Sequence, residues 1–136
     1  KISGPLLDRI DIHIEVTPVP FEKLSETRKA ESSVEIRKRV TKARDIQTKR
    51  FENYNHIHYN AQMSSKLIRE YCDLDEVSLQ LLKTAMERLN LSARAYDRIL
   101  KVSRTIADLE NSENVHSHHI AEAIQYRSLD REGWLG

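Results

Sequence analysis

The chain has 136 residues, which suits one compact domain or one domain with a fragment of a neighbour. Its 22 Lys and Arg nearly balance 21 Asp and Glu, so bulk charge gives no reason to expect a polyanion partner. The single Cys72 excludes an internal disulfide and a cysteine-built zinc site, and it is typical of a small buried hydrophobe in a reducing compartment. No apolar run approaches the roughly 20 residues that span a bilayer and no secretory segment opens the chain, so we expect a cytoplasmic protein without membrane contact.

Glycine content decides one question about nucleotides. The three glycines are Gly4, Gly133 and Gly136, all near the ends. A Walker loop needs glycines whose backbone N–H groups wrap phosphate, followed by Lys and Ser or Thr, and a dinucleotide fold needs its own glycine cluster. Neither pattern occurs here, so we do not expect this chain to turn over a nucleotide alone.

Residues 9–16 alternate strictly between polar and apolar side chains, with Ile10, Ile12, Ile14 and Val16 in the apolar positions. Period two with β-branched residues predicts a strand. No second alternating run follows, and an isolated strand is unstable in water, so we expect a strand or extended segment left over from a sheet. Pro18 and Pro20 then break regular structure. We place a boundary there. Residues 1–20 form the edge of another domain and can be disordered without its sheet, and residues 21–136 form a helical domain.

The remainder predicts a mostly α fold, a bundle of four to five helices. Ser32 and Glu35 have the spacing of a capping box, and the helix they open has an apolar stripe to about Phe51. Its opposite face is basic, with Arg37, Lys38, Lys42, Arg44 and Lys49. A shorter helix should end near Cys72.

Three further stretches have clear helix boundaries. Asp73 or Asp75 can cap a helix that Asn90 stops, and Ser92 opens the strongest helix, which should end near Glu110. A last helix should follow a cap at His116 or Ser117, bracketed by the apolar pair Val115 and Ile120 and also burying Ala123 and Ile124.

Two clusters suggest chemistry but have plainer explanations. His118 and His119 are adjacent on a helix and diverge by about 100°, and neither a Cys nor a convincing carboxylate joins them at ligand spacing, so we predict no metal site. The basic helix face could track a nucleic-acid backbone, since aligned cations match phosphates. A solvated face explains it equally, because Glu31, Glu35, Asp45 and Glu52 are interleaved with the cations.

Three arginines have positions that suit an anion. Arg94 lies in the first turn behind the Ser92 cap, where unpaired backbone N–H groups favour negative charge, and Arg98 follows one turn later. Arg94 could clamp a phosphate, although the spacing alone favours an ordinary salt bridge to Asp97 or a neighbouring acid. Arg9 lies at the entrance of the predicted strand, where a side chain can project.

Four ordered blocks of the sequence resemble one family. They are residues 1–12 with Gly4-Pro5-Leu6-Leu7-Asp8-Arg9, residues 31–44, residues 91–109 with Ser92-Ala93-Arg94, and residues 119–127. They resemble the C-terminal part of the Mg-chelatase-like AAA+ ATPases of the ComM and YifB family, over nearly the whole chain. The resemblance implies that the Walker A loop, the Walker B acids and sensor 1 all precede Lys1.

The resemblance also implies roles for the arginines. Arg9 corresponds to the arginine finger, which reaches a nucleotide held by the next subunit, and Arg94 to the sensor-2 residue of the lid, which contacts the γ-phosphate. Arg98 ranks behind Arg94 because its match falls one turn too late. A planar, permanently charged guanidinium suits both roles.

The resemblance further implies ATP and Mg2+ as cofactors of the full-length protein and none for this fragment. The implied partners are the N-terminal AAA+ core, neighbouring subunits of a homo-oligomeric ring, usually a hexamer, and DNA as the substrate of the ComM branch. Within the family the alternative is a metal-chelatase motor. From another class, the alternative is a free-standing helical adaptor that binds protein or nucleic acid and never contacts ATP.

Overall fold

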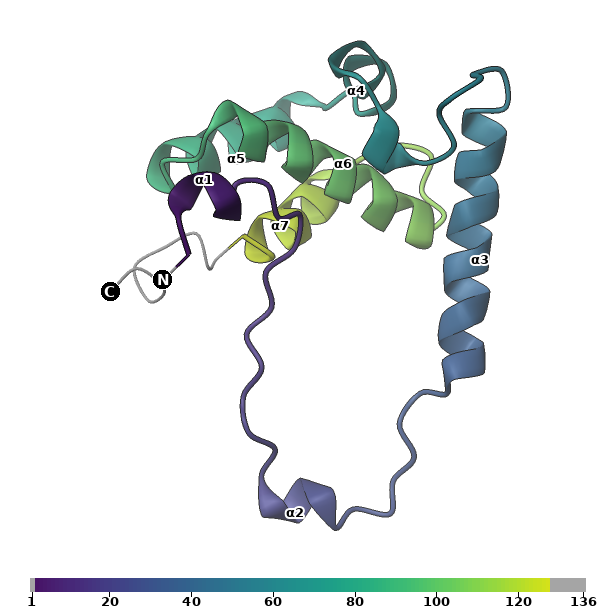
Figure 1. Cartoon of the computed structure of the whole chain (residues 1–136), viewed down its shortest axis with the longest axis vertical. Coiled ribbons are helices and arrows are strands. Elements are labelled where there is room, and N and C mark those ends of the chain that lie inside the picture. The colour runs from purple at the N-terminus through teal and green to yellow at the C-terminus, as the bar shows by residue number, and fades with distance from the viewer. Residues whose placement is uncertain (1, 128–136) are drawn as a thin grey trace.

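The computed structural model describes residues 2–127 as helices joined by loops (Figure 1). The helices are α1 (Gly4–Leu7), α2 (Phe21–Leu24), α3 (Ser33–Arg50), α4 (Ser65–Tyr71), α5 (Glu76–Arg88), α6 (Ala93–Leu109) and α7 (Ser117–Gln125), with a 3-10 turn η1 (Asn60–Gln62). The predicted helical bundle is confirmed, and α3 to α7 are its helices. The single turns α1 and α2 were not expected. Lys1 and residues 128–136, the outer ends of the two predicted domains, lie outside the described residues, and the domain division stays a prediction.

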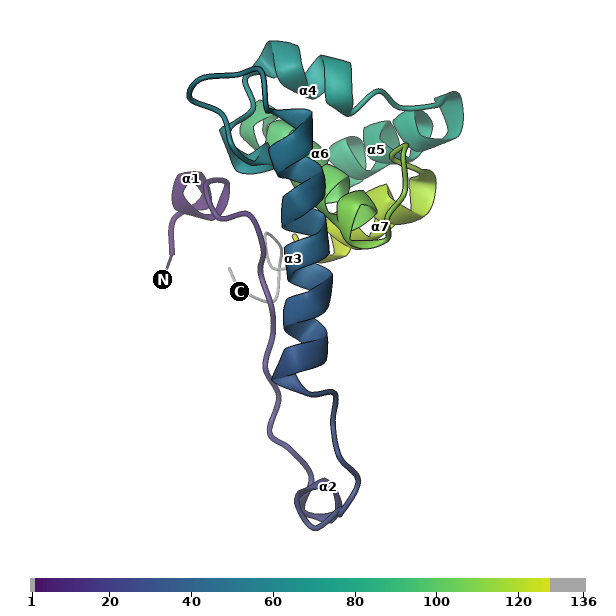
Figure 2. The ribbon, with the colours of Figure 1, turned by 90° about the vertical axis from the view of Figure 1, so that its right-hand side faces the viewer.

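The predicted strand over residues 9–16 does not form. Among the described residues there is no strand, and this segment follows the extended path that was the other expectation (Figures 1 and 2). A strand needs a second strand to pair with its backbone N–H and C=O groups, and the described residues offer none. An alternating pattern is therefore not enough to form a sheet. Ile14 and Val16 are consequently 66% and 88% exposed.

Side-chain caps begin the principal helices where the sequence predicted them. Ser32 Oγ accepts from the Glu35 N–H at 3.3 Å, Asp75 Oδ1 from the Ser78 N–H at 2.7 Å, and Ser92 Oγ from the Ala95 N–H at 3.3 Å. At Ser32 the reciprocal half of the capping box is not seen, because the Glu35 carboxylate pairs with Lys38 at 3.1 Å instead. Each such cap stabilises a helix by roughly 1 kcal/mol.

Two asparagines turn the chain after α5 and α6. Asn90 has φ 45° and Asn111 has φ 60°, both in the left-handed region that asparagine tolerates better than most residues. The turn at Asn90 leads directly into the Ser92 cap. The turn at Asn111 returns the chain so that α7 packs along α6.

Helix α6 lies at the centre of the bundle, where it contacts α3, α4, η1 and α7, while α5 packs on α7 (Figure 1). Its inward face includes Ile99 and Leu100, buried as the stripe predicted. Burying one such side chain stabilises the fold by about 1.5–3 kcal/mol. The core contains Phe51, Met63, Leu67, Ile68, Cys72, Leu82, Ile99, Leu100, Ala107, Val115, Ile120 and Ala123.

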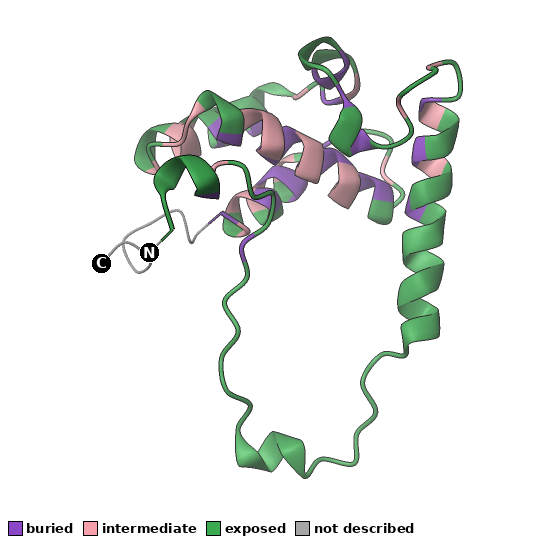
Figure 3. Ribbon diagram, viewed as in Figure 1, coloured by how far each residue is buried: buried purple, intermediate pink, exposed green. Residues whose placement is uncertain are grey.

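Helix α3 is buried along only part of its length (Figure 3). Ala43 and Gln47 face α6, and the polar Gln47 is accommodated because its Oε1 accepts from the Asn60 N–H at 2.9 Å. Ile36 and Val40 continue the same stripe toward the N-terminus of α3 but remain 42% and 46% exposed. The predicted apolar stripe is therefore correct in register and only half covered.

A buried ionic cluster joins α3 to α6. The Asp108 carboxylate, with no exposed side-chain surface, accepts from Arg50 Nη1 at 2.8 Å and from Arg50 Nη2 at 2.6 Å. Arg104 Nη2 lies 3.2 Å from the same carboxylate, and Asn60 Nδ2 donates to it at 2.9 Å. Burial lowers the pKa of the Arg104 guanidinium, and the charge of Asp108 opposes that shift. We call Arg50, Asn60, Arg104 and Asp108 the Asp108 cluster.

Candidate nucleotide-contacting arginines

Arg94 is exposed in the first turn of α6. Within the described chain its side chain makes no hydrogen bond or ion pair, and the first turn contains no acid. The salt bridge to Asp97 that the spacing allowed is therefore not present. Arg94 belongs to the same first turn as the N-terminal backbone N–H groups of α6, and both the cation and these donors favour an anion at this end of the helix.

Arg98, one turn further along α6, already has a partner. Its Nη1 lies 2.5 Å from Asp11 Oδ1, and the two side chains are 33% and 48% exposed. An ion pair exposed to this extent contributes little to stability because water screens it. It does occupy the guanidinium, so of the two arginines Arg94 is the one whose donors are available.

Arg9 projects from the turn that follows α1, and its side chain is exposed. The turn is ordered by backbone hydrogen bonds from the Arg9 N–H to Leu6 O at 3.0 Å and from the Ile10 N–H to Leu7 O at 3.1 Å. Two residues later, Asp11 makes the ion pair with Arg98. The segment that contains Arg9 is thus held against the same helix that presents Arg94.

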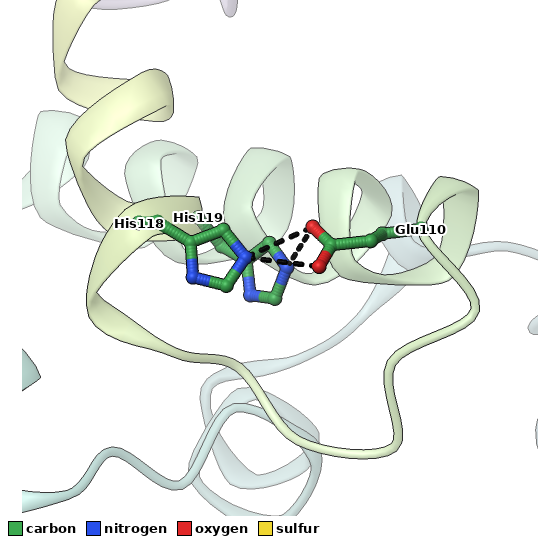
Figure 4. Close-up of side chains that lie close together, drawn as sticks. All are labelled: Glu110, His118 and His119. Carbon is green, nitrogen blue, oxygen red and sulfur yellow. Dashed lines mark hydrogen bonds and ion pairs between the residues drawn. The ribbon is translucent and has the colours of Figure 1, made fainter.

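Glu110 receives hydrogen bonds from two histidines of α7 (Figure 4). His118 Nε2 lies 2.9 Å from Glu110 Oε2, and the buried His119 Nε2 lies 2.8 Å from the same oxygen. These bonds, that from His118 first, lower the pKa of the Glu110 carboxyl below its usual value. The sequence analysis did not identify Glu110 as the partner of the two histidines. Glu110 follows the end of α6 and the histidines lie in the first turn of α7, so the short loop between these helices brings them together.

The donor geometry of His119 favours a hydrogen-bonded cluster over a metal site. Its Nδ1 accepts from the His116 N–H at 2.9 Å, so in the neutral ring the proton resides on Nε2 and points to Glu110. A metal-bound histidine instead coordinates through a deprotonated nitrogen and usually donates from the other one. Glu110, His118 and His119 are close enough to surround an ion, but His119 would have to lose its helix-capping bond. The absence of a metal stays a prediction.

Cys72 behaves as the sequence predicted, a buried apolar side chain. It lies in the core, and burial raises the pKa of its thiol to about 12. A thiol with that pKa is protonated near neutral pH, and the thiolate is the nucleophilic form. Cys72 is therefore a packing residue.

Residues 30–127 match the family model described as magnesium chelatase, subunit ChlI C-terminal. The chain belongs to this family. The ChlI C-terminal match includes α3 to α7 and ends at Arg127, so it contains Arg94 and Arg98, while Arg9 precedes it.

Relatives of this chain confirm the resemblance to the ComM and YifB group. It is 42% identical to the competence protein ComM of Haemophilus influenzae and 39% identical to the uncharacterised protein YifB of Escherichia coli, each over 96% of the chain and 25% of the relative. It is 32% identical to the uncharacterised protein Mb2921c of Mycobacterium bovis, over 93% of the chain and 25% of that relative. The chain thus spans about a quarter of the length of these curated relatives. None of its described helices is long and apolar enough to cross a membrane.

Proposed function

We propose that the chain is the helical lid module of a Mg-chelatase-like AAA+ ATPase. In this proposal Arg94 is the sensor-2 residue, Arg9 is the arginine finger that acts on the neighbouring subunit's nucleotide, and the ring is a homo-oligomer, usually a hexamer. ATP and Mg2+ would be held chiefly by a core outside this chain. The observation that carries the proposal is the exposed guanidinium of Arg94 at the N-terminal turn of α6, which has no partner among residues 2–127.

The contrast between Arg94 and Arg98 supports that assignment. A γ-phosphate carries negative charge on its outer oxygens, and it gains most from a guanidinium whose donors are not already occupied. Arg98 would first have to release Asp11. Arg94 needs no such exchange, and the N-terminal end of α6 adds its own positive potential. A lid with this residue can therefore contact bound ATP directly and change its position when the phosphate is released.

Replacing Arg94 with Ala in the full-length protein tests the sensor-2 role. The change removes a charge that would contact the phosphate, so we expect kcat for ATP hydrolysis to fall by about 10²-fold. Because Arg94 is exposed on α6, the substitution should have little effect on folding. Steady-state ATPase assays and thermal melting would measure the two effects. Arg98→Ala is the matched control, and a larger loss in that variant than in Arg94→Ala would reverse the assignment.

For the substrate of the ring we propose DNA, on the basis of α3. Its exposed outer face presents Arg37, Lys42 and Lys49, none of which forms an ion pair among the described residues. On the same helix Lys38 is paired with Glu35, and Arg44 stacks on the Tyr59 ring at 5.5 Å. Three unpaired cations along one helix match the phosphates of a nucleic-acid backbone, and their binding releases counterions.

The triple change Arg37→Ala, Lys42→Ala and Lys49→Ala in the full-length protein tests this interaction. We expect weaker DNA binding at every sequence, and a log–log salt dependence that is shallower by about 0.9 for each phosphate that the variant no longer neutralises. Binding titrations at several salt concentrations measure both quantities. A control with three other exposed cations removed, Lys66→Ala, Arg69→Ala and Lys83→Ala, should leave the slope unchanged; equal effects in the two triples would argue against α3 as the DNA-binding element.

A further inference from the structure

Arg127 follows α7 and is fully buried, yet its guanidinium bonds to the opposite end of the described chain. Nη1 donates to Ile10 O at 2.7 Å, and Nη2 donates to Leu7 O at 3.2 Å. The two carbonyls belong to the residues on either side of the pair Asp8 and Arg9. One guanidinium therefore donates hydrogen bonds to the backbone on both sides of the turn that contains Arg9.

Neighbouring contacts hold the same segment to α7. The His13 N–H donates to Tyr126 O at 2.7 Å, and the Leu7 side chain is buried. The His13 ring is also 3.3 Å from Leu7 O through Nε2. We call Tyr126 and Arg127, with the backbone of residues 7–13 that they contact, the α7 clamp.

The chemistry of the α7 clamp explains why an arginine is needed. The Leu7 carbonyl also accepts from the Ile10 N–H at 3.1 Å, and the Ile10 carbonyl accepts from Arg127 Nη1 at 2.7 Å, so Arg127 binds the first and the last carbonyl of the turn. The rigid guanidinium fork supplies two donors in a fixed geometry, which a lysine ammonium on a flexible stem cannot match. The guanidinium therefore sets the orientation of the Arg9 turn, because it fixes both ends of that turn relative to α7.

We propose that Arg127 is a positioning residue that orients the Arg9 turn on the helical module. The proposal rests on the assignment of Arg9 as the arginine finger. Because α7 packs on α6, Arg127 joins the finger to the helix that presents Arg94. A displacement of the lid around one subunit's nucleotide would then move the finger that this subunit offers to its neighbour, which couples successive sites of the ring.

Kinetics of the full-length protein with Arg127→Gln provide the first test. An Å-scale displacement of a reacting group can cost about 10²-fold in rate, so we expect kcat to fall by about 10–10²-fold while KM for ATP stays unchanged. Arg127→Lys retains a charged donor group but loses the planar fork, so it should recover part of the rate. The double variant Arg9→Ala with Arg127→Gln should be no slower than Arg9→Ala alone, because both changes act through one side chain. Additive losses would overturn the proposal.

Mixing subunits separates positioning from a purely structural role. In a ring of Arg127→Gln and Arg94→Ala subunits, an Arg127→Gln subunit keeps its own sensor and can receive an intact finger from an Arg94→Ala neighbour. We expect the mixture to hydrolyse ATP faster than either variant alone. A mixture no faster than the mean of the two overturns the proposal, as does normal turnover in Arg127→Gln. Normal turnover in Arg9→Ala would instead show that Arg9 is not the arginine finger, and so contradict the proposed function on which this inference rests.

Discussion

Arg9→Ala in the full-length protein is expected to lower kcat for ATP hydrolysis by about 10³-fold or more. An arginine finger supplied by a neighbouring subunit is worth 10³–10⁵ in rate in other phosphoryl-transfer enzymes, because it neutralises charge that develops on the transferring group. Arg9 has the exposure that such a role needs, and its turn is held by backbone hydrogen bonds rather than by its own side chain. The substitution should therefore leave the fold intact.

Two comparisons make the Arg9 experiment specific. Arg9→Lys preserves the positive charge but loses the planar pair of donors, so its rate should lie between those of the native protein and Arg9→Ala. Arg28→Ala removes an exposed cation from the loop between α2 and α3 and should leave the rate unchanged. Circular dichroism and oligomer size would be measured on every variant. An Arg9→Ala protein that assembles and retains more than about a tenth of the native rate would exclude the finger role.

Local signals in the sequence predicted the helices well. The caps at Ser32, Asp75 and Ser92 depend on residues three apart or fewer, and all three form where expected. Apolar spacing likewise placed Ile99 and Leu100 on the buried face of α6. In each case the determining interaction lies within one or two helical turns, so the linear sequence contains it.

Features that depend on distant residues were not predictable in the same way. The alternation at Ile14 and Val16 correctly indicated an extended backbone, but strand formation requires a partner that the described chain does not supply. The pairing of Arg98 with Asp11 joins residues far apart in sequence, and no local pattern indicates it. The α7 clamp was missed for the same reason, since Arg127 finds its acceptors near the other end of the chain.

The Asp108 cluster gives the largest expected effect on stability. Asp108→Ala would remove the carboxylate that Arg50 contacts through both terminal nitrogens and that Arg104 also approaches. Breaking a buried pair by removing one partner typically costs 3–5 kcal/mol, because the remaining charge stays buried without compensation. We expect a loss of about 4 kcal/mol in the free energy of unfolding, a large part of the roughly 5–15 kcal/mol of a typical domain.

Urea denaturation of the chain, followed by circular dichroism, would measure this loss as a lower midpoint at an unchanged slope. Glu87→Ala, which removes an exposed acid from α5, is the matched control and should stay within about 0.5 kcal/mol of the native value. A cost below about 1 kcal/mol for Asp108→Ala would mean that water reaches the two guanidinium groups and that the cluster is not the junction between α3 and α6.

Removing Arg50 together with Asp108 distinguishes the charge from the packing. Arg104 retains acceptors in the backbone oxygens of Tyr71, Ser112 and Glu113, at 3.3, 2.8 and 3.0 Å, so it depends less on the carboxylate than Arg50 does. The double variant Arg50→Leu with Asp108→Leu should therefore be more stable than Asp108→Ala, because apolar replacements leave only one buried charge and that charge remains hydrogen-bonded. If the double variant were the less stable of the two, the loss would have to come from misfitted packing around α3.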